Sequence, residues 1–253
     1  MEKIKLGIDA RLYGTSNRGL GRFVQEILES LDDLKDYEVT IFVDPEKRAT
    51  YSASASARII DAPFKPYSFS EQAKFPSLIK GAQVDLMIFP HFNVPLFCPV
   101  RYVVVIHDLI LHHLPTRLAS QRSRFVYWFK YLIFRLSFRI VVEMAEQVIC
   151  VSHFTAEDVR SYYPHLVNKL NILKESSADL IKFGDDDRNM VLSYNKCSSF
   201  VLIVGAFYPH KNLERSLRVW KAVRPNLDLW LVGREDSFSK KLQAEARDLG
   251  ILN

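Results

Sequence analysis

The sequence predicts an α/β protein that has one complete domain with a parallel sheet and the first part of a second such domain. Short runs rich in Val and Ile alternate along the chain with amphipathic stretches of helical spacing. This alternation is typical of parallel strands that are covered by helices on both faces. A second strand, loop and helix pattern begins at Val201, only about 50 residues before Asn253, whereas a typical domain has ~100 residues or more. We therefore expect the chain to be incomplete at its C-terminal end.

The first domain is expected to span residues 1–175 and to be Rossmann-like. Its helix over Leu20–Leu34 has the clearest pattern, because apolar residues recur at helical spacing with charged residues between them. Strands are expected at Ile4–Asp9, Glu38–Val43, Val84–Phe89, Tyr102–Ile106, Gln147–Val151 and Leu170–Leu173, and further helices at Ser70–Lys80, Ser120–Met144 and Thr155–Tyr163.

A polar linker over residues 176–198 is expected to precede the second domain, which would occupy residues 199–253. The pattern there predicts a strand at Val201–Val204, a helix from Lys211, a strand at Leu227–Val232 and a last helix from Ser237. These elements would form a partial Rossmann-like domain.

Composition restricts the class of protein. Hydrophobic residues make up 48% and charged residues 25%, as in a folded globular protein. The net charge of +5 suits anionic ligands or an acidic membrane surface and is too small to indicate nucleic-acid binding. The three cysteines are an odd count without metal-ligand spacing, and neither a signal peptide nor a membrane-spanning run is found. We therefore expect a cytoplasmic protein with reduced thiols.

The end of the first strand carries the first candidate binding residues. Asp9-Ala-Arg11 leads into a loop that reaches Gly19-Leu-Gly21-Arg22. Ligands of open α/β sheets bind at the carboxyl ends of strands, near helix N-termini that attract anions. Glycines there let the backbone approach a phosphate closely, although an ordinary tight turn would require the same small residues.

His107-Asp108 closes a buried strand and forms the second candidate. Polar residues at this position of a parallel sheet are typical of catalytic or ligand-binding groups, although His107 can equally be a core histidine. A metal site that combines His107 with His112 and His113 is rejected, because no carboxylate or cysteine completes the ligand set; we interpret His112 and His113 as loop residues. No metal is expected.

Two further loops supply candidates. Ser152 follows the strand ending at Val151 and would line the same edge, while Thr155-Ala-Glu-Asp158 has the spacing of a capping box. In Gly205-Ala-Phe-Tyr-Pro-His-Lys211 a glycine opens a loop and a lysine stands at a helix start. That pair suits a diphosphate, although Lys211 can also be a solvent-exposed side chain beside an ordinary loop.

The order of these motifs resembles the family-four retaining glycosyltransferases, the mannosyltransferase-like group with the two-domain GT-B fold. The matching motifs run from Ile8-Asp-Ala-Arg11 through Gly19-Leu-Gly-Arg-Phe23, His107-Asp-Leu109, Val148-Ile-Cys-Val-Ser-His-Phe-Thr155 and Val204-Gly-Ala-Phe-Tyr-Pro-His-Lys-Asn-Leu213 to Leu231-Val-Gly-Arg234. The resemblance implies transfer of a sugar, with retention, from a nucleotide-sugar to a saccharide or lipid-linked acceptor in surface polysaccharide or lipopolysaccharide synthesis. It implies no cofactor beyond the nucleotide-sugar co-substrate.

The resemblance also implies roles for individual residues. His107 and Asp108 would be catalytic, with His107 near the transferred sugar. Gly19, Gly21, Gly205 and Lys211 would bind the donor, and Lys211 would stabilise the charge that grows on the leaving diphosphate. Arg11, Arg22 and Ser152 would bind the acceptor.

Some features depart from the family pattern. Ala206 stands where an arginine or a short polar residue is common, and His210 stands where Arg or Glu often precedes the lysine. The family's glutamate pair, which holds the sugar and ribose, would lie beyond Asn253. The alternative is therefore a truncated, catalytically inactive homologue that acts as a binding or scaffolding partner.

The basic segment from Arg117 to Arg139 carries two apolar stripes on one expected helix. Phe125, Phe129, Leu132, Leu136 and Ile140 form one stripe, and Tyr127, Tyr131, Phe134 and Phe138 form the other, nearly opposite. One stripe must cover the sheet. The other requires a partner, which can be another part of the protein, a second subunit or, through residues 122–140, the inner face of a membrane.

Overall fold

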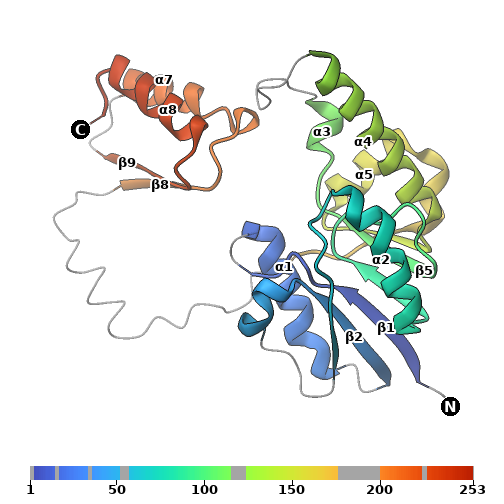
Figure 1. Cartoon of the computed structure of the whole chain (residues 1–253). Coiled ribbons are helices and arrows are strands. Elements are labelled where there is room, and N and C mark those ends of the chain that lie inside the picture. Colours follow the sequence, from blue (N-terminus) through green and yellow to red (C-terminus); the bar gives the residue numbers. More distant parts are fainter. Residues whose placement is uncertain are drawn as a thin grey trace. The chain divides into compact units, whose positions relative to one another are not determined.

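The computed structural model describes residues 3–14, 17–33, 36–51, 57–114, 124–175, 200–223 and 227–252. The chain divides into two compact units (Figure 1). Unit 1 comprises residues 1–113 and 128–178, and unit 2 comprises residues 114–127 and 179–253. The expected linker over 176–198 lies outside the described residues.

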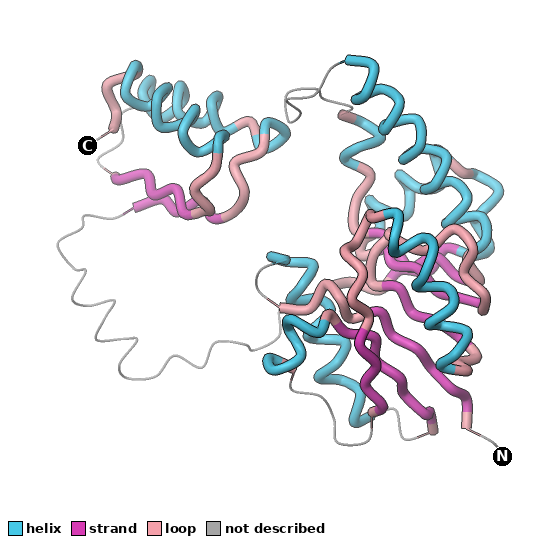
Figure 2. Tube along the Cα trace, viewed as in Figure 1, coloured by secondary structure: helices cyan, strands magenta, loops and turns pink. Residues whose placement is uncertain are grey.

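Unit 1 is built on a seven-stranded parallel sheet, whose strands lie side by side in Figure 2. The strand order is β3-β2-β1-β4-β5-β6-β7, so the winding direction reverses between β1 and β4. Such a reversal opens a crevice at the carboxyl ends of the strands, where ligands of this fold class bind. The strands are β1 (Ile4–Asp9), β2 (Tyr37–Val43), β3 (Arg58–Asp61), β4 (Leu86–Phe89), β5 (Arg101–Ile106), β6 (Gln147–Cys150) and β7 (Leu170–Ile172).

Helices cover both faces of this sheet, as the sequence predicts. One hydrophobic cluster joins α2, α4 and α5 to the face that carries Phe42 and Val104. A second cluster joins α1 to the opposite face, where Val24 and Leu28 pack near Ile8. The helices are α1 (Arg18–Glu29), α2 (Phe69–Ala82), the short α3 (Ile110–His113), α4 (Arg124–Met144) and α5 (His153–Tyr162).

Unit 2 contains a two-stranded parallel sheet and two helices. Strand β8 (Phe200–Val204) pairs with β9 (Asp228–Val232), and α7 (Leu213–Val223) and α8 (Ser237–Asp248) pack together through a small core. That core consists of Leu213, Leu217, Leu242 and Ala246. Together the two units confirm the expected α/β class with parallel sheets.

Several local predictions were wrong. Strand β3 was not expected, because its four residues lie at the sheet edge and give too short an alternating pattern. His112 and His113 were interpreted as loop residues, but they belong to α3, and His112 is buried at 5% exposure. The second-domain helix begins at Leu213 and not at Lys211, which lies in a preceding 3₁₀ turn. The described residues contain no helix that is both long and apolar enough to span a bilayer.

Candidate functional site

The candidate site lies at the carboxyl edge of the unit 1 sheet, around the point where the strand order reverses. Five strands or their following loops contribute one polar side chain each, so residues far apart in sequence meet there. These side chains are Asp9 at the end of β1, His91 after β4, His107 after β5, Ser152 after β6 and Glu175 after β7.

His107 is held in a fixed orientation through both ring nitrogens. Its Nδ1 lies 2.7 Å from Oε1 of Glu175, and its Nε2 lies 2.8 Å from the carbonyl oxygen of Pro90. The carbonyl can only accept, so Nε2 carries a hydrogen. Phe23 of α1 packs its ring edge-on at 4.9 Å. These contacts fix the orientation of the His107 ring at the edge of the sheet.

His91 lies beside His107 and was missed by the sequence analysis. The two rings stack with their centroids 6.3 Å apart, and the Tyr67 hydroxyl lies 3.0 Å from Nδ1 of His91. Burial, together with the neighbouring His107, lowers the pKa of His91 to about 3, so this ring is neutral near pH 7. The sequence pattern that identified His107 also occurs here, because His91 lies two residues after the apolar strand β4.

Arg11 lies at the centre of a buried ion-pair cluster. Its guanidinium donates two hydrogen bonds to the Asp9 carboxylate, at 2.8 and 2.6 Å, and one to Oε1 of Glu71 at 2.6 Å. It also donates to the Phe64 carbonyl and lies 4.1 Å above the Phe75 ring. The Arg11 side chain is 1% exposed. The prediction that Arg11 binds the acceptor therefore needs correction. Asp9, Glu71 and the Phe64 carbonyl occupy its guanidinium, so the geometry favours a structural role for Arg11.

Glu71 links this cluster to the histidines. Its side chain is fully buried, and it accepts hydrogen bonds from the Asn93 amide at 2.7 Å and from the Tyr67 backbone N–H at 2.7 Å. Burial raises the pKa of Glu71, while Arg11 opposes that shift. Tyr67 and Asn93 also contact His91, so the ion-pair cluster fixes part of the surroundings of that ring. Glu71 is 60 residues from Arg11 in sequence, and no local pattern reveals the pairing.

The predicted glycine loop is in fact the first turn of α1. Gly19 and Gly21 both lie within that helix, and a Cβ on Gly21 would meet the Gly14 carbonyl oxygen at 2.0 Å, so only glycine fits there. Asn17 does not cap the helix with its side chain, which instead donates to the Leu12 carbonyl. The helix therefore presents a positive N-terminus, and the exposed Arg22 in its first turns adds a further positive charge.

Asp108 and Ser152 both act as local caps. Asp108 accepts the Ile110 backbone N–H at 3.0 Å at the start of α3. Ser152 is the N-cap of α5 and accepts the Thr155 backbone N–H at 3.0 Å, so the prediction of Thr155 as the cap was wrong. The Thr155 hydroxyl instead donates to the His107 carbonyl at 3.1 Å. This hydrogen bond ties α5 to the strand end that carries the candidate histidine.

The histidines near this edge do not form a metal centre in the described residues, where no three His, Cys, Asp or Glu side chains come together as ligands. His112 packs between aromatic rings, 4.6 Å from Phe138 and 5.2 Å from Tyr162. His113 pairs with Asp158 at 2.7 Å.

Unit 2 carries the other two predicted donor residues. Gly205 follows β8 with a φ of +146°, a conformation that favours glycine, and its carbonyl would lie 2.2 Å from a Cβ on Gly233. Lys211 ends the 3₁₀ turn over Pro209–Lys211 and is exposed. It lines a cavity of 420 Å³ together with Arg215, which the sequence analysis missed. Two cations that line the same cavity suit an anionic ligand.

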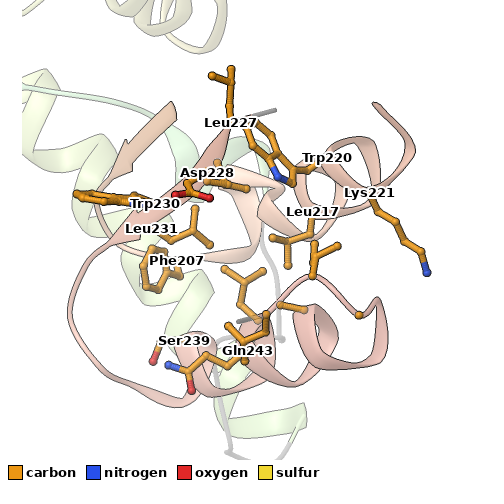
Figure 3. A pocket seen from close by; sticks show the side chains of 16 residues that line it. Phe207, Leu217, Trp220, Lys221, Leu227, Asp228, Trp230, Leu231, Ser239 and Gln243 are labelled. Atoms are coloured by element: carbon orange, nitrogen blue, oxygen red, sulfur yellow. The ribbon is translucent and has the colours of Figure 1, made fainter. Parts of the chain in front are cut away.

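A larger cavity of 730 Å³ in unit 2 carries no such chemistry (Figure 3). Its walls come from α7, α8 and β9, and most of the labelled side chains are apolar, among them Phe207, Leu217 and Trp230. Leu217 also belongs to the small core of this unit. The cavity is therefore an exposed part of the apolar core of unit 2. Neither Gly205 nor Lys211 lines it.

Comparison with known proteins identifies similar chains. Residues 17–170 match the family model described as Glycosyltransferase Family 4. The chain is 18% identical over 248 residues to the O-antigen chain mannosyltransferase RfbU of Salmonella typhimurium, a match that covers 93% of this chain and 64% of that protein. The chain therefore spans less than two thirds of the length of this curated relative.

Solved structures that share the fold include the following two. The Anabaena protein Alr3699/HepE, crystallised with UDP and glucose, superposes with a TM-score of 0.66 at 13% identity and covers 99% of this chain and 67% of its own. A glycosyltransferase from Rickettsia africae superposes with a TM-score of 0.55 at 12% identity, covering 100% of this chain and 67% of its own. At these identities the likeness establishes the architecture alone.

Proposed function

This chain belongs to glycosyltransferase family 4, and from that premise we propose that it transfers a sugar from a nucleotide-sugar to a saccharide or lipid-linked acceptor. The observation that carries the proposal is the setting of His107. Glu175, Pro90 and Phe23, from three separate segments, orient its ring at the sheet edge where ligands of this fold class bind. A purely structural histidine in the core would not need to stand at that edge with 19% of its side chain exposed.

In this proposal His107 contacts the sugar that is transferred, and the neutral His91 with Tyr67 forms the adjoining acceptor wall. Transfer breaks the bond between the anomeric carbon and the diphosphate and forms a bond to an acceptor oxygen, whose proton leaves with the diphosphate. Oriented polar groups lower the barrier by stabilising charge as it develops on the sugar. Asp108 and Ser152 stand next to this edge, and Arg22 adds a positive charge for an anionic group of either substrate.

The donor diphosphate would be held by positive groups that the chain itself supplies. Lys211 and Arg215 line one cavity in unit 2. These two cations would neutralise the leaving group without a bound metal. Within unit 1, the N-terminus of α1, with Gly19 and Gly21 in its first turn, offers backbone N–H groups to an anion. The HepE structure was solved with UDP and glucose, which supports a uridine nucleotide as the first donor to test.

Retention of the anomeric configuration and a role in surface polysaccharide or lipopolysaccharide synthesis complete the proposal. They rest on the family and on the similarity to an O-antigen mannosyltransferase. The reaction would take place in the cytoplasm.

One observation favours a second function. In the part of unit 2 that the structure describes, the donor residues stand on a sheet of two strands. A catalytically inactive homologue that binds or scaffolds a partner would keep the site of unit 1 and lack donor binding.

Calorimetric titration with UDP, GDP and ADP distinguishes the two functions. We expect one nucleotide to bind and Lys211→Ala to weaken it about tenfold, because the substitution removes one diphosphate contact. Lys240→Ala, which removes an exposed lysine from α8 of the same unit, is the matched control and should leave the affinity unchanged. Absence of binding to all three nucleotides would contradict donor binding by this chain and favour the inactive homologue.

A further inference from the structure

Tyr67 combines an unusual backbone conformation with an exposed ring beside the candidate site. Its φ is +63°, in the left-handed region that a bulky side chain rarely adopts. Among the described residues, the other non-glycine examples are Gln83 and Asn212, and each ends a helix or 3₁₀ turn, where this conformation is common. Tyr67 instead precedes Ser68, the N-cap of α2, so no helix end explains its backbone. Such outliers cluster at ligand-binding sites.

Contacts at the backbone and at the hydroxyl hold Tyr67 in this conformation. Its backbone N–H donates to Oε2 of the buried Glu71 at 2.7 Å, and its hydroxyl lies 3.0 Å from Nδ1 of His91. The ring also packs near the rings of His91 and Phe92, whose centroids are 6.0 and 6.2 Å away. Tyr67 is nevertheless 63% exposed. Its ring is therefore fixed in orientation while much of its surface stays open to a ligand.

His91, next to Tyr67, is held as one tautomer. Its Nδ1 accepts the backbone N–H of Asn93 at 3.3 Å, so this nitrogen carries no hydrogen, and the Tyr67 hydroxyl donates to it as well. Because the pKa of His91 is lowered to about 3, the ring is neutral and has its one hydrogen on Nε2. Within the part of the chain that the structure describes, His91 makes no other hydrogen bond. Its Nε2–H is therefore a donor available to a ligand.

We propose that Tyr67 and His91 form a subsite for a pyranose ring of the acceptor, which stacks on the Tyr67 ring and accepts a hydrogen bond at one hydroxyl from Nε2 of His91. A pyranose has apolar C–H faces and a rim of hydroxyls, so it requires an apolar platform beside an oriented polar group. The His91 ring stacks on His107 with the centroids 6.3 Å apart. A sugar in this subsite therefore adjoins the position proposed for the transferred sugar.

The chemistry of the subsite favours a sugar over a bare lipid phosphate as the group that receives the transferred sugar. His91 offers a neutral N–H, whereas cations bind phosphate best. Arg11, which shares Glu71 with Tyr67, donates to Glu71 and Asp9 and is only 1% exposed. The inference rests on the proposed function, because a transferase must hold an acceptor, and it narrows that acceptor to one with a sugar at its accepting end.

Saturation-transfer-difference NMR on the whole chain tests the subsite without requiring turnover. The probes are the methyl pyranosides of glucose, galactose, mannose and N-acetylglucosamine, with glycerol phosphate as the probe that lacks a sugar. At least one pyranoside should bind, and glycerol phosphate should not. Tyr67→Leu should weaken the pyranoside about tenfold, because the stacking surface is lost. His91→Phe should weaken it about fivefold, because the ring packing stays and the N–H donor is removed.

Two further variants separate stacking from effects on folding. Tyr67→Phe keeps the ring and should bind within about threefold of the unmodified chain. Tyr37→Leu removes a tyrosine that is 38% exposed at the start of β2, at the opposite edge of the sheet, and should leave binding unchanged. Equal weakening by Tyr67→Leu and Tyr37→Leu, or absence of binding by all four pyranosides, overturns the inference.

An octyl pyranoside distinguishes a free saccharide from a lipid-linked one. Its affinity should fall about tenfold in Tyr67→Leu, whether or not the alkyl chain adds to binding. An affinity that Tyr67→Leu leaves intact would assign binding to the alkyl chain and contradict stacking.

Parallel calorimetry with UDP, GDP and ADP keeps the two proposals apart. Nucleotide binding without pyranoside binding overturns the subsite and leaves the transferase proposal standing. Pyranoside binding that depends on Tyr67, without nucleotide binding, supports the subsite and contradicts donor binding by this chain.

Discussion

The two units use the same sequence pattern, an apolar parallel strand followed by a loop and a helix, but they bury it to very different extents. Val104 and Ile106 of β5 are fully buried, whereas Val201 and Val204 of β8 are 39% and 68% exposed. Strand β5 has a neighbour on each side, while β8 pairs with β9 alone in the described residues. The burial of a strand therefore depends on the strands and helices beside it. The apolar sequence of the strand alone does not determine how far its side chains are buried.

The same difference separates the candidate binding residues. In unit 1 the polar side chains at the sheet edge are fixed by one another, as the hydrogen bonds of His107 and Arg11 show. In unit 2 Lys211 is exposed on a short turn. We therefore expect substitutions at the unit 1 edge to affect stability strongly and substitutions at the unit 2 turn to affect binding alone.

The largest expected contrast is between two basic residues, Arg11 and Lys211. Arg11→Ala should lower the free energy of unfolding by about 4 kcal/mol, because Asp9 and Glu71 would then remain as buried carboxylates without a counter-charge. Lys211→Ala should change it by less than about 0.5 kcal/mol. Urea unfolding followed by circular dichroism measures both. Equal effects of the two substitutions would show that the cluster around Arg11 does not stabilise unit 1.

Next in size is the contrast between core strands. Ile106→Ala should cost about 3 kcal/mol, since it leaves a cavity in a fully buried part of the sheet. Leu202→Ala should cost roughly 1 kcal/mol, because its side chain is 49% exposed. The same unfolding measurement applies. If Leu202→Ala is as costly as Ile106→Ala, further strands or a partner must cover β8 in solution.

The third contrast concerns pH. Burial, with a smaller contribution from Arg135, lowers the pKa of His112 to about 4 from its ordinary value of 6.5. Between these values the unfolded chain binds a proton that the folded chain does not. The stabilisation is thus complete above pH 6.5 and is lost as the pH falls towards 4.

We therefore expect His112→Phe to retain about 1.5 kcal/mol more stability than the unmodified chain on acidification from pH 7 to pH 5. The ring would fit the cluster of Phe134, Phe138 and Tyr162. His210→Phe, at an exposed position in unit 2, is the control and should leave the pH dependence as it is. Parallel curves for His112→Phe and the unmodified chain would contradict the assignment of a neutral buried ring.

The smallest expected effect concerns Glu175, which orients His107. Glu175→Gln should reduce kcat about tenfold with little change in KM, because the amide weakens the hydrogen bond to the ring without altering the substrate contacts. Glu235→Gln, an exposed acid after β9, is the control in unit 2. A change confined to KM would make Glu175 a binding residue rather than a positioning one.

The sequence predicted the architecture because local patterns determine most of it. Helix α1 was predicted over Leu20–Leu34 because Val24 and Leu28 mark its buried face directly. It begins at Arg18 and ends at Glu29, where a 3₁₀ turn over Ser30–Asp33 continues the chain. Strand β3 was missed because only pairing with β2 defines it. The two stripes of α4 were likewise visible in the sequence, but which stripe faces solvent follows only from the packing of Phe138.

The candidate site was predicted in part. His107 and Ser152 were identified because they end apolar strands, and His91 could have been found by the same reasoning. Glu71, Asn93 and Glu175 could not, because their roles arise from contacts between segments distant in the chain. For the same reason the sequence pointed to Arg11 as a binding residue, although buried carboxylates surround it.

The most direct test is the release of nucleoside diphosphate from UDP-, GDP- and ADP-sugars by the whole chain, with a lipid extract and oligosaccharides as acceptors. We predict turnover with one of the three donors and a fall of about 100-fold in His107→Ala, because an oriented polar group at the reacting sugar would be lost. His165→Ala, at an exposed histidine of unit 1, should keep full turnover. No release from any donor, or equal release by both variants, would contradict a transferase site at His107.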